Sequence, residues 1–443
     1  MRNDYNIRYI VLISFISAIG GYLFGFDFAV ISGALPFLKV QFGLDAYWEG
    51  FTTGSLALGC MLGCLLAGRL SEKRGRKVAL MTAACIFAVS SLAMALAPSL
   101  WMFIIARFVA GIGVGMASML SPMYIAEVSP AALRGRMVAL NQLTIVIGIL
   151  VTNLVNYTLR NSGEDAWRWM FGLGLIPSAL FCMGILFLPE SPRWLIKAGR
   201  LDQAKGVLSR IGKPHIASST FNQIEHAVAR ETQLNFSMAF RKPFSIALAA
   251  GIVLAVFQQF CGINVVFNYS TTIFESMGFS KSDQLMQTVF IGAVNLLFTF
   301  VALALVDKLG RKPLMLIGAI GLAFLYILIA QFLNIDAMLS TVLLLAAIGL
   351  YASTLAPITW VLISEIFPPK VRNEATTIAV VCLWAAYFIL TFTFPILAKW
   401  MGGVAHTFYI YATICVVAAL FIWRKIRETK GVALEDMDTV FAH

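Results

Sequence analysis

The sequence predicts an all-α membrane protein with about twelve transmembrane helices, arranged as two pseudo-symmetric six-helix bundles with a cytoplasmic helical linker domain. Hydrophobic residues make up 60% of the 443 residues and charged residues only 12%, whereas soluble domains carry roughly a quarter charged residues. Apolar stretches of about 20 residues, the length that crosses a bilayer as a helix, recur along the chain. The second half also repeats charged motifs of the first, which indicates a duplication.

The predicted spans form two groups of six, separated by one long polar segment. They must be helical, because hydrocarbon offers no partner for open backbone amides. The first group lies near residues 9–35, 50–70, 78–97, 101–123, 136–157 and 168–188, and the second near 243–270, 284–306, 313–333, 340–363, 373–397 and 403–423.

These groups predict four domains: an N-terminal bundle (1–189), an intracellular helical domain (190–242), a C-terminal bundle (243–423) and a cytoplasmic tail (424–443). The pattern of the intracellular domain is typical of short amphipathic helices, with a turn expected at 212–219. It reads either as a passive linker or, as we prefer, as a cytoplasmic latch.

Two glutamate–arginine pairs mark the repeat. Glu127 and Arg134 recur at the same mutual spacing as Glu365 and Arg372, each pair just after a long apolar segment. Charges at matched helix ends of a duplicated membrane protein are typical of transporters whose two halves rock around a central site.

The net charge of +11 follows membrane topology rather than a nucleic-acid surface. Lysine and arginine concentrate in alternate loops, near 73–77, 134–136, 308–312 and 370–372, and in the segments 190–242 and 424–430. By the positive-inside rule these loops are cytoplasmic. We therefore expect a multi-pass protein of a bacterial-type inner membrane, with both termini in the cytoplasm and no nucleic-acid partner.

The sequence lacks the motifs expected of an ATP-hydrolysing protein, an enzyme or a metalloprotein. There is no phosphate-binding GxxxxGK[ST] loop, and no nucleophile–base constellation that would indicate an enzyme. Gly111, Gly113 and Gly115 lie in the middle of an apolar span, where close helix packing is the better interpretation. All seven cysteines fall within predicted spans, so we expect no disulfide, metal or other cofactor. No histidine lies deep in a span, which excludes a histidine proton relay.

Asp27 is the most informative single residue. It interrupts the apolar first span, where an ionisable group costs several kcal/mol unless it is paired or hydrated. Arg107, in the fourth span, is the only base at a comparable depth, so we expect the two to meet. Separating such a pair favours protonation of the carboxylate. This predicts a proton-coupled switch; a static ion pair between two helices is the alternative.

A second group of intramembrane polar residues is neutral. Amides donate and accept hydrogen bonds, and an indole offers an apolar face with one donor, which together suit a polyhydroxylated ring. The group comprises Gln142, Gln258, Gln259, Asn264, Asn268, Asn295, Trp360 and Trp384. Gly262 and Pro357 interrupt two of these spans and predict local bending or unwinding, as hinges or as static kinks.

The chain resembles the sugar porter family of the major facilitator superfamily, and within this family it resembles bacterial D-xylose/proton symporters. The matching strings cover nearly the whole chain: GFDFAVISG (25–33), GRLSEKRGRK (68–77), RFVAGIGVG (107–115), YIAEVSPAALRGR (124–136), NQLTIVIG (141–148), PESPRWL (189–195), QQFCGIN (258–264), DKLGRK (307–312), SEIFP (364–368) and RETKG (427–431). The resemblance implies alternating access and assigns proton coupling to Asp27 and Arg107.

The resemblance also implies roles for two further sets of residues. The expected sugar contacts are Phe24, Gln142, Gln258, Gln259, Asn264, Asn295, Trp360 and Trp384. The expected cytoplasmic gate, which would hold the bundles together when the outside is open, comprises Arg76, Glu127, Arg134, Glu190, Arg193, Asp307, Arg311, Glu365, Arg372 and Glu428. Asn268 stands where the family usually has Tyr. Leu383 stands where a xylose symporter has a sugar-binding Gln, and Ile149 replaces another Gln; the smaller number of amides weakens the case for xylose itself.

These observations predict a proton-coupled symporter that imports a monosaccharide, a pentose or a hexose, by alternating access. Its expected partners are the sugar, the proton and membrane lipid, and we expect a monomer. The alternatives are a passive sugar uniporter and, less favoured, a sugar sensor that does not transport.

Overall fold

The structure is a computed structural model that describes residues 4–229, 240–241, 244–367, 371–426 and 428. Within this part, twelve helices are long and apolar enough to cross a membrane, which confirms the predicted all-α membrane fold. Among the described residues, the single β-bridge joins Tyr5 to Gly212.

The contacts divide the chain into two compact units that do not follow the two sequence halves. Unit 1 contains residues 1–27, 59–149 and 171–233, and unit 2 contains residues 28–58, 150–170 and 234–443. Several helices therefore contribute to both units. The predicted division into four sequence domains stays a prediction.

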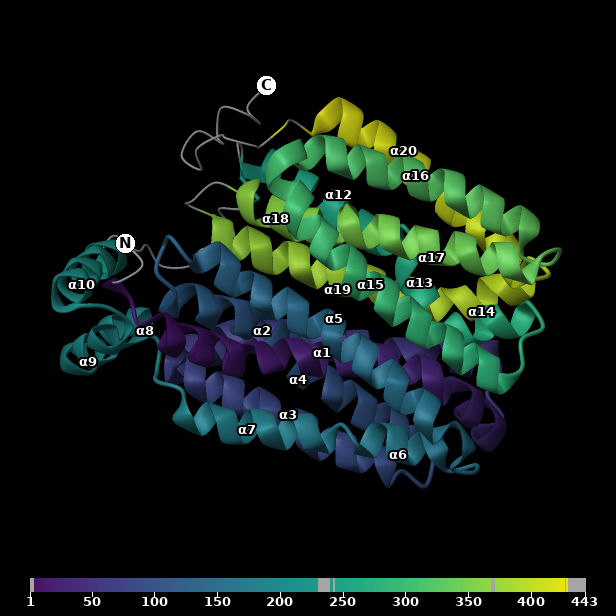
Figure 1. The fold of residues 1–443 in the computed structure, drawn as a ribbon, viewed down its shortest axis with the longest axis horizontal. Helices are drawn as coiled ribbons and strands as arrows, with labels where there is room; N and C mark the ends of the chain where they lie inside the picture. The colour runs from purple at the N-terminus through teal and green to yellow at the C-terminus, as the bar shows by residue number, and fades with distance from the viewer. Residues whose placement is uncertain (1–3, 230–239, 242–243, 368–370, 427, 429–443) are drawn as a thin grey trace. The chain divides into compact units, whose positions relative to one another are not determined.

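Three long helices of unit 1 lie side by side, with α3 between α4 and α7 (Figure 1). The helices that lie wholly or partly in unit 1 are α1 (Ile7–Phe42), α2 (Ala46–Arg74), α3 (Arg76–Ala95), α4 (Leu100–Val128), α5 (Arg134–Thr158), α6 (Ala166–Gly172), α7 (Leu175–Phe187), α8 (Pro192–Lys197), α9 (Leu201–Ile211) and α10 (Pro214–Ala229). α8, α9 and α10 contact one another. They lie in the segment expected to form the intracellular domain, and that assignment stays a prediction.

In unit 2, α16 runs beside α20 (Figure 1). Its remaining helices are α12 (Phe244–Phe260), α13 (Ile263–Asn268), α14 (Ser270–Ser276), α15 (Lys281–Leu309), α16 (Arg311–Phe332), α17 (Ala337–Ser353), α18 (Leu355–Glu365), α19 (Arg372–Trp400) and α20 (Val404–Lys425), and a 3₁₀ turn at Leu159–Asn161 follows α5.

Side-chain caps explain where several helices begin. The Ser99 hydroxyl accepts from the Met102 amide at the start of α4 (3.4 Å), and the Asp336 carboxylate accepts from the Leu339 amide at the start of α17 (2.9 Å). Such side chains satisfy amides that have no partner within the first helical turn. The segment 212–219, expected as a turn, is mostly helical because α10 already begins at Pro214, a residue whose missing amide suits the first turn.

Two spans are broken where the sequence predicts interruptions. Gly262 separates α12 from α13 with a φ of +84°, a conformation that disfavours residues with a Cβ. The second break, at Thr354 between α17 and α18, lies three residues before Pro357. A proline ring clashes with the carbonyl four residues earlier, so the helix is interrupted just upstream of it. The role of the two breaks as hinges stays a prediction.

Candidate functional site

Asp27 of α1 and Arg107 of α4 form a buried ion pair within unit 1. Their side chains are fully buried, and Arg107 Nη1 lies 3.5 Å from Asp27 Oδ1. Among the described residues, Asp27 Oδ2 and Arg107 Nε and Nη2 have no hydrogen-bond partner. The structure thus brings together the two residues that depth along the helices predicts to meet, in a geometry that leaves much of their hydrogen-bonding capacity unused.

An aromatic ring and a close approach of two helices adjoin this pair. The Arg107 guanidinium lies 5.8 Å from the ring centroid of Phe171, within range of a cation–π contact. Beside Arg107, α2 and α4 pack closely, because a Cβ at Gly59 would overlap the backbone carbonyl of Phe108; further along α4, a Cβ at Gly115 would overlap the backbone of Cys60. This agrees with helix packing as the interpretation of the glycine-rich string in α4. The pair is therefore held in a tight environment of low polarity.

Unit 2 contains a chain of hydrogen-bonded amides around the break at Gly262. Gln258 Nε2 donates to the Tyr351 hydroxyl (2.6 Å) and Gln259 Nε2 donates to Gln258 Oε1 (2.5 Å). Asn264 Nδ2 donates to Gln259 Oε1. A side-chain amide has two donors and an acceptor with two lone pairs, so this chain retains unused donors and acceptors for a polar solute.

The other predicted sugar contacts are distributed as follows. Phe24 and Gln142 are half-buried in unit 1, and Asn295 is buried in unit 2. Trp384 is buried in unit 2, with its ring edge-on to Tyr387 at 5.6 Å between centroids. The side chain of Trp360 lies outside the described part of the chain.

Two tyrosines of unit 2 were missed by the sequence reasoning. Tyr351 anchors the amide chain, and the Tyr387 hydroxyl donates to Asn268 Oδ1 (2.9 Å) while Asn268 Nδ2 donates to the Asn264 carbonyl (2.7 Å). Both tyrosines lie within apolar spans. The sequence shows that each carries a hydroxyl group, but it does not show which side chain that hydroxyl contacts.

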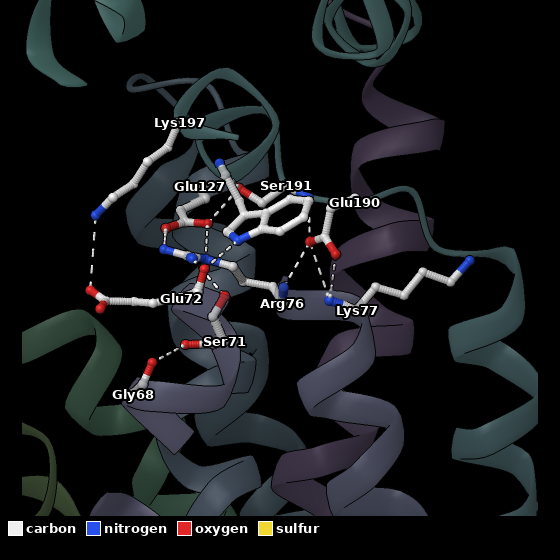
Figure 2. A network of polar contacts seen from close by, with 10 residues as sticks. Gly68, Ser71, Glu72, Arg76, Lys77, Glu127, Glu190, Ser191 and Lys197 are labelled. Atoms are coloured by element: carbon white, nitrogen blue, oxygen red, sulfur yellow. Dashed lines mark hydrogen bonds and ion pairs between the residues drawn. The ribbon is translucent and has the colours of Figure 1, made fainter. Parts of the chain in front are cut away.

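Residues of the expected cytoplasmic gate form a polar network at the start of α3 (Figure 2). Arg76 donates to both carboxylate oxygens of Glu127, from Nη2 at 2.9 Å and Nε at 3.0 Å. Ser191 Oγ also donates to Glu127 (2.5 Å). Paired hydrogen bonds between a guanidinium and a carboxylate are among the strongest in proteins, so α3, α4 and the start of α8 are firmly joined.

Glu190 caps the N-terminus of α3. Its carboxylate accepts from the backbone amides of Arg76 (2.8 Å) and Lys77 (3.2 Å), where the helix dipole favours a negative charge. Gly75, with a φ of +97°, allows this approach, since a Cβ there would overlap the carboxylate. Burial nevertheless raises the pKa of Glu190 above its ordinary value, against the amide hydrogen bonds, which lower it.

The same arrangement recurs in unit 2. The Glu428 carboxylate accepts from the backbone amides of Arg311 and Lys312, both at 3.0 Å. Gly310 precedes them with a φ of +90° and, like its counterpart in unit 1, leaves room for the carboxylate. The duplication in the sequence therefore extends to the detailed geometry of a helix start.

Two further gate residues, Arg134 and Arg193, lie in unit 1. Arg134 is exposed and its Nε donates to the Ala126 carbonyl (3.1 Å), and Arg193 is half-buried. The contacts of Arg76, Glu127 and Glu190 given above lie within unit 1, and the predicted contact between the two halves stays a prediction. The side chains of Asp307, Glu365 and Arg372 lie outside the described part of the chain.

A further set of contacts in unit 2 joins the C-terminal part of α1 and the start of α2 to α14. Ser32 Oγ lies 2.5 Å from Ser270 Oγ, and Thr271 Oγ1 donates to the Ser32 carbonyl (2.8 Å). Glu49 of α2, only 5% exposed, accepts a hydrogen bond from Thr272 Oγ1 of α14 (3.5 Å), and its carboxylate lies 3.3 Å from Lys39 Nζ of α1. The segment before α1, in contrast, adjoins α9 and α10, because Asp4 and Tyr5 contact the connection between these two helices.

Comparison with known proteins identifies the family. Residues 13–441 match the family model described as "Sugar (and other) transporter". The chain is 38% identical over 486 residues to the D-xylose-proton symporter of Escherichia coli strain K12, with 100% of this chain and 97% of the relative covered. It is 37% identical over 450 residues to the arabinose-proton symporter of Bacillus subtilis, with the same coverage.

Solved structures agree with this result. An inward-open structure of the xylose transporter XylE from Escherichia coli superposes with a TM-score of 0.87 at 35% identity, covering 98% of this chain and 100% of that one. A structure of the same symporter with bound 6-bromo-6-deoxy-D-glucose gives a TM-score of 0.82 at 35% identity, covering 99% and 100%. The chain belongs to the sugar transporter family and has the fold of the major facilitator superfamily.

Proposed function

We propose that this protein is a proton-coupled symporter that imports a monosaccharide across the inner membrane. The observation that carries the proposal is the buried pair of Asp27 and Arg107, in a family whose similar members are named as proton symporters for xylose and arabinose. A passive carrier has no need to bury an acidic group at this cost.

The proton acts on Asp27. The carboxylate takes up one proton and becomes a neutral acid, which removes its Coulomb attraction to Arg107 and leaves the guanidinium free to change partners. The long 3.5 Å contact and the unused Oδ2 atom support this role, because they leave an oxygen that can accept a proton. Proton loss restores the pair.

The sugar binds through neutral groups. The amide chain of Gln258, Gln259 and Asn264 lies beside a break in a transmembrane span, the position at which transporters of this type place their substrate sites. Its unused donors and acceptors match the hydroxyl groups of a sugar, and Trp384 supplies an apolar face. We assign Phe24, Gln142, Asn295 and Trp360 to the same site on the basis of the family resemblance alone.

Alternating access would use two sets of contacts at opposite ends of α1. The network of Arg76, Glu127 and Glu190 stiffens the end that we assign to the cytoplasm, where the remaining gate residues would join the two halves. The contacts of Ser32 and Glu49 with α14 would close the other end. This orientation places both termini in the cytoplasm, and we expect a monomer surrounded by lipid.

A panel of radiolabelled pentoses and hexoses in proteoliposomes tests the proposal. With a pH gradient directed inward, one sugar should accumulate above its external concentration, and a protonophore should abolish the accumulation. Equal uptake with and without the gradient would instead identify a passive uniporter. Saturable binding without any counterflow would identify a sensor.

A further inference from the structure

A cavity of about 330 Å³ lies in unit 1, between the connection of α4 to α5 and the intracellular helices. This volume falls at the lower end of the range of small-molecule sites. The proposed transport cycle does not use the cavity as a binding site. Its walls are formed by Tyr5, residues 126–131, Arg134, Arg193, Leu208, Ile211, Gly212, Ile216, Ala217, Thr220, Gln223 and Ile224.

Part of the lining is polar, and its Ser129 hydroxyl and Arg134 guanidinium have unused hydrogen-bonding atoms. Ser129 is only 4% exposed and its Oγ has no partner among the described residues, which is costly for a buried hydroxyl. Arg134 is anchored through its Nε to the Ala126 carbonyl, and no described residue accepts from its two terminal amino groups. The Glu127 carboxylate, in contrast, is already bound by Arg76 and Ser191.

A second part of the lining is apolar and comes from the amphipathic helices α9 and α10. It includes Leu208, Ile211, Ile216 and Ile224. Tyr5 also lines the cavity, because the segment before α1 is bound to the connection of α9 and α10: the Asn6 amide donates to the Ile211 carbonyl (2.9 Å). The cavity therefore pairs a cationic, hydroxyl-bearing wall with an apolar one.

We propose that this cavity binds a small organic anion, a phosphate monoester or a carboxylate carried on a compact apolar or ring-shaped body. The anionic group lies against the terminal amino groups of Arg134, whose planar geometry matches two oxygens of a phosphate or carboxylate. Ser129 Oγ donates the next hydrogen bond. The body of the ligand packs on the side chains of α9 and α10.

Binding of the anion in this cavity also affects transport; this part of the inference rests on the proposed cytoplasmic gate. Arg134 is one of the residues assigned to that gate, and an anion bound to its guanidinium competes with any acidic gate partner. The anion therefore acts as an inhibitor from the cytoplasmic face.

Phenyl phosphate is a suitable probe because it combines a phosphate monoester with a ring. Binding to the purified full-length protein in detergent is measured by isothermal titration calorimetry, without sugar. One molecule should bind per chain, and inorganic phosphate should bind more weakly. Arg134→Gln should weaken binding about tenfold or more, as expected for loss of a charge-assisted contact. Ser129→Ala should weaken it a few-fold, and Arg136→Gln, at an exposed arginine outside the cavity, should not change it.

Ala217→Trp, which fills the cavity, should abolish binding while thermal unfolding stays cooperative. Absence of saturable binding, or equal binding by wild type, Arg134→Gln and Ser129→Ala, would overturn the proposal. Displacement of phenyl phosphate by phosphatidic acid, a phosphate monoester, in nanodiscs, with phosphatidylcholine inactive, would identify a lipid headgroup as the anion's source and uphold the site. Phenyl phosphate trapped inside proteoliposomes should slow sugar counterflow. If binding is observed but transport is not, the site holds and the proposed function fails.

Discussion

Replacing Asp27 with Asn tests the central ion pair with little change of shape. The asparagine oxygen can still accept a hydrogen bond from Arg107, but it can neither carry a negative charge nor take up the coupling proton. The wild-type residues are fully buried and 3.5 Å apart, so the substitution leaves an uncompensated cation in the protein interior.

The expected magnitudes differ for coupling and for stability. If one proton enters with each sugar, a pH gradient of one unit supplies about 1.4 kcal/mol, enough for about tenfold accumulation. Asp27→Asn should reduce this ratio to about one, with counterflow retained. Breaking a buried pair from one side costs about 3–5 kcal/mol of stability, and the remaining amide acceptor should bring the loss toward the lower end.

The assay measures sugar accumulation and counterflow in the same proteoliposomes, with thermal unfolding of the purified variants recorded separately. Asp165→Asn is a matched control, since Asp165 is exposed and pairs with Arg168 at 2.7 Å; it should leave accumulation unchanged. The double variant Asp27→Asn with Arg107→Gln should recover part of the lost stability, because no buried charge remains, and should stay uncoupled.

Retention of tenfold accumulation by Asp27→Asn would refute the reasoning, since the coupling proton would then bind elsewhere. If the variant loses both counterflow and accumulation but unfolds like the wild type, that result would also contradict the reasoning. In that case the pair would serve the conformational change itself rather than coupling.

Three further predictions concern the described networks. Because burial raises the pKa of Glu190, the native state holds the Glu190 proton more tightly than the unfolded state does. The free energy of unfolding should therefore fall as pH rises from about the ordinary value of 4.5 through the raised value. Glu190→Gln should remove this pH dependence from thermal unfolding, and an unchanged pH dependence would contradict the assignment. Gly75→Ala should destabilise the protein by at least about 1 kcal/mol, because its φ is positive and the new Cβ meets the Glu190 carboxylate. Gly206→Ala, inside α9 with open space around it, should instead stabilise by about 0.5–1 kcal/mol in the same unfolding assay. Gln259→Ala should weaken sugar binding by about 0.5–1.5 kcal/mol, up to roughly tenfold, in binding titrations, whereas Gln203→Ala, exposed on α9, should bind like wild type; equal weakening in both would point to general destabilisation.

Helix number could be predicted from the sequence because it depends on local composition, and the family could be predicted because its motifs are short strings that are read directly from the chain. A run of about 20 apolar residues has few stable alternatives to a membrane-spanning helix, and the repeated motifs fall at helix ends. Asp27 and Arg107 were also predictable as partners, because hydrocarbon makes an unpaired charge costly and few candidates exist at that depth. The break at Gly262 follows from the same kind of local signal.

Other contacts could be identified only from the tertiary structure. They join segments that are far apart in the sequence, and no local sequence pattern indicates that these segments meet. The contacts of Tyr351 with Gln258 and of Tyr387 with Asn268 connect different spans through hydroxyl groups that an apolar pattern hides. The helical part of the segment 212–219 also escaped prediction: Pro214 suits the first position of α10, and α10 packs on α9. Composition along the chain thus determined what crosses the membrane, and packing between helices decided which polar groups meet within it.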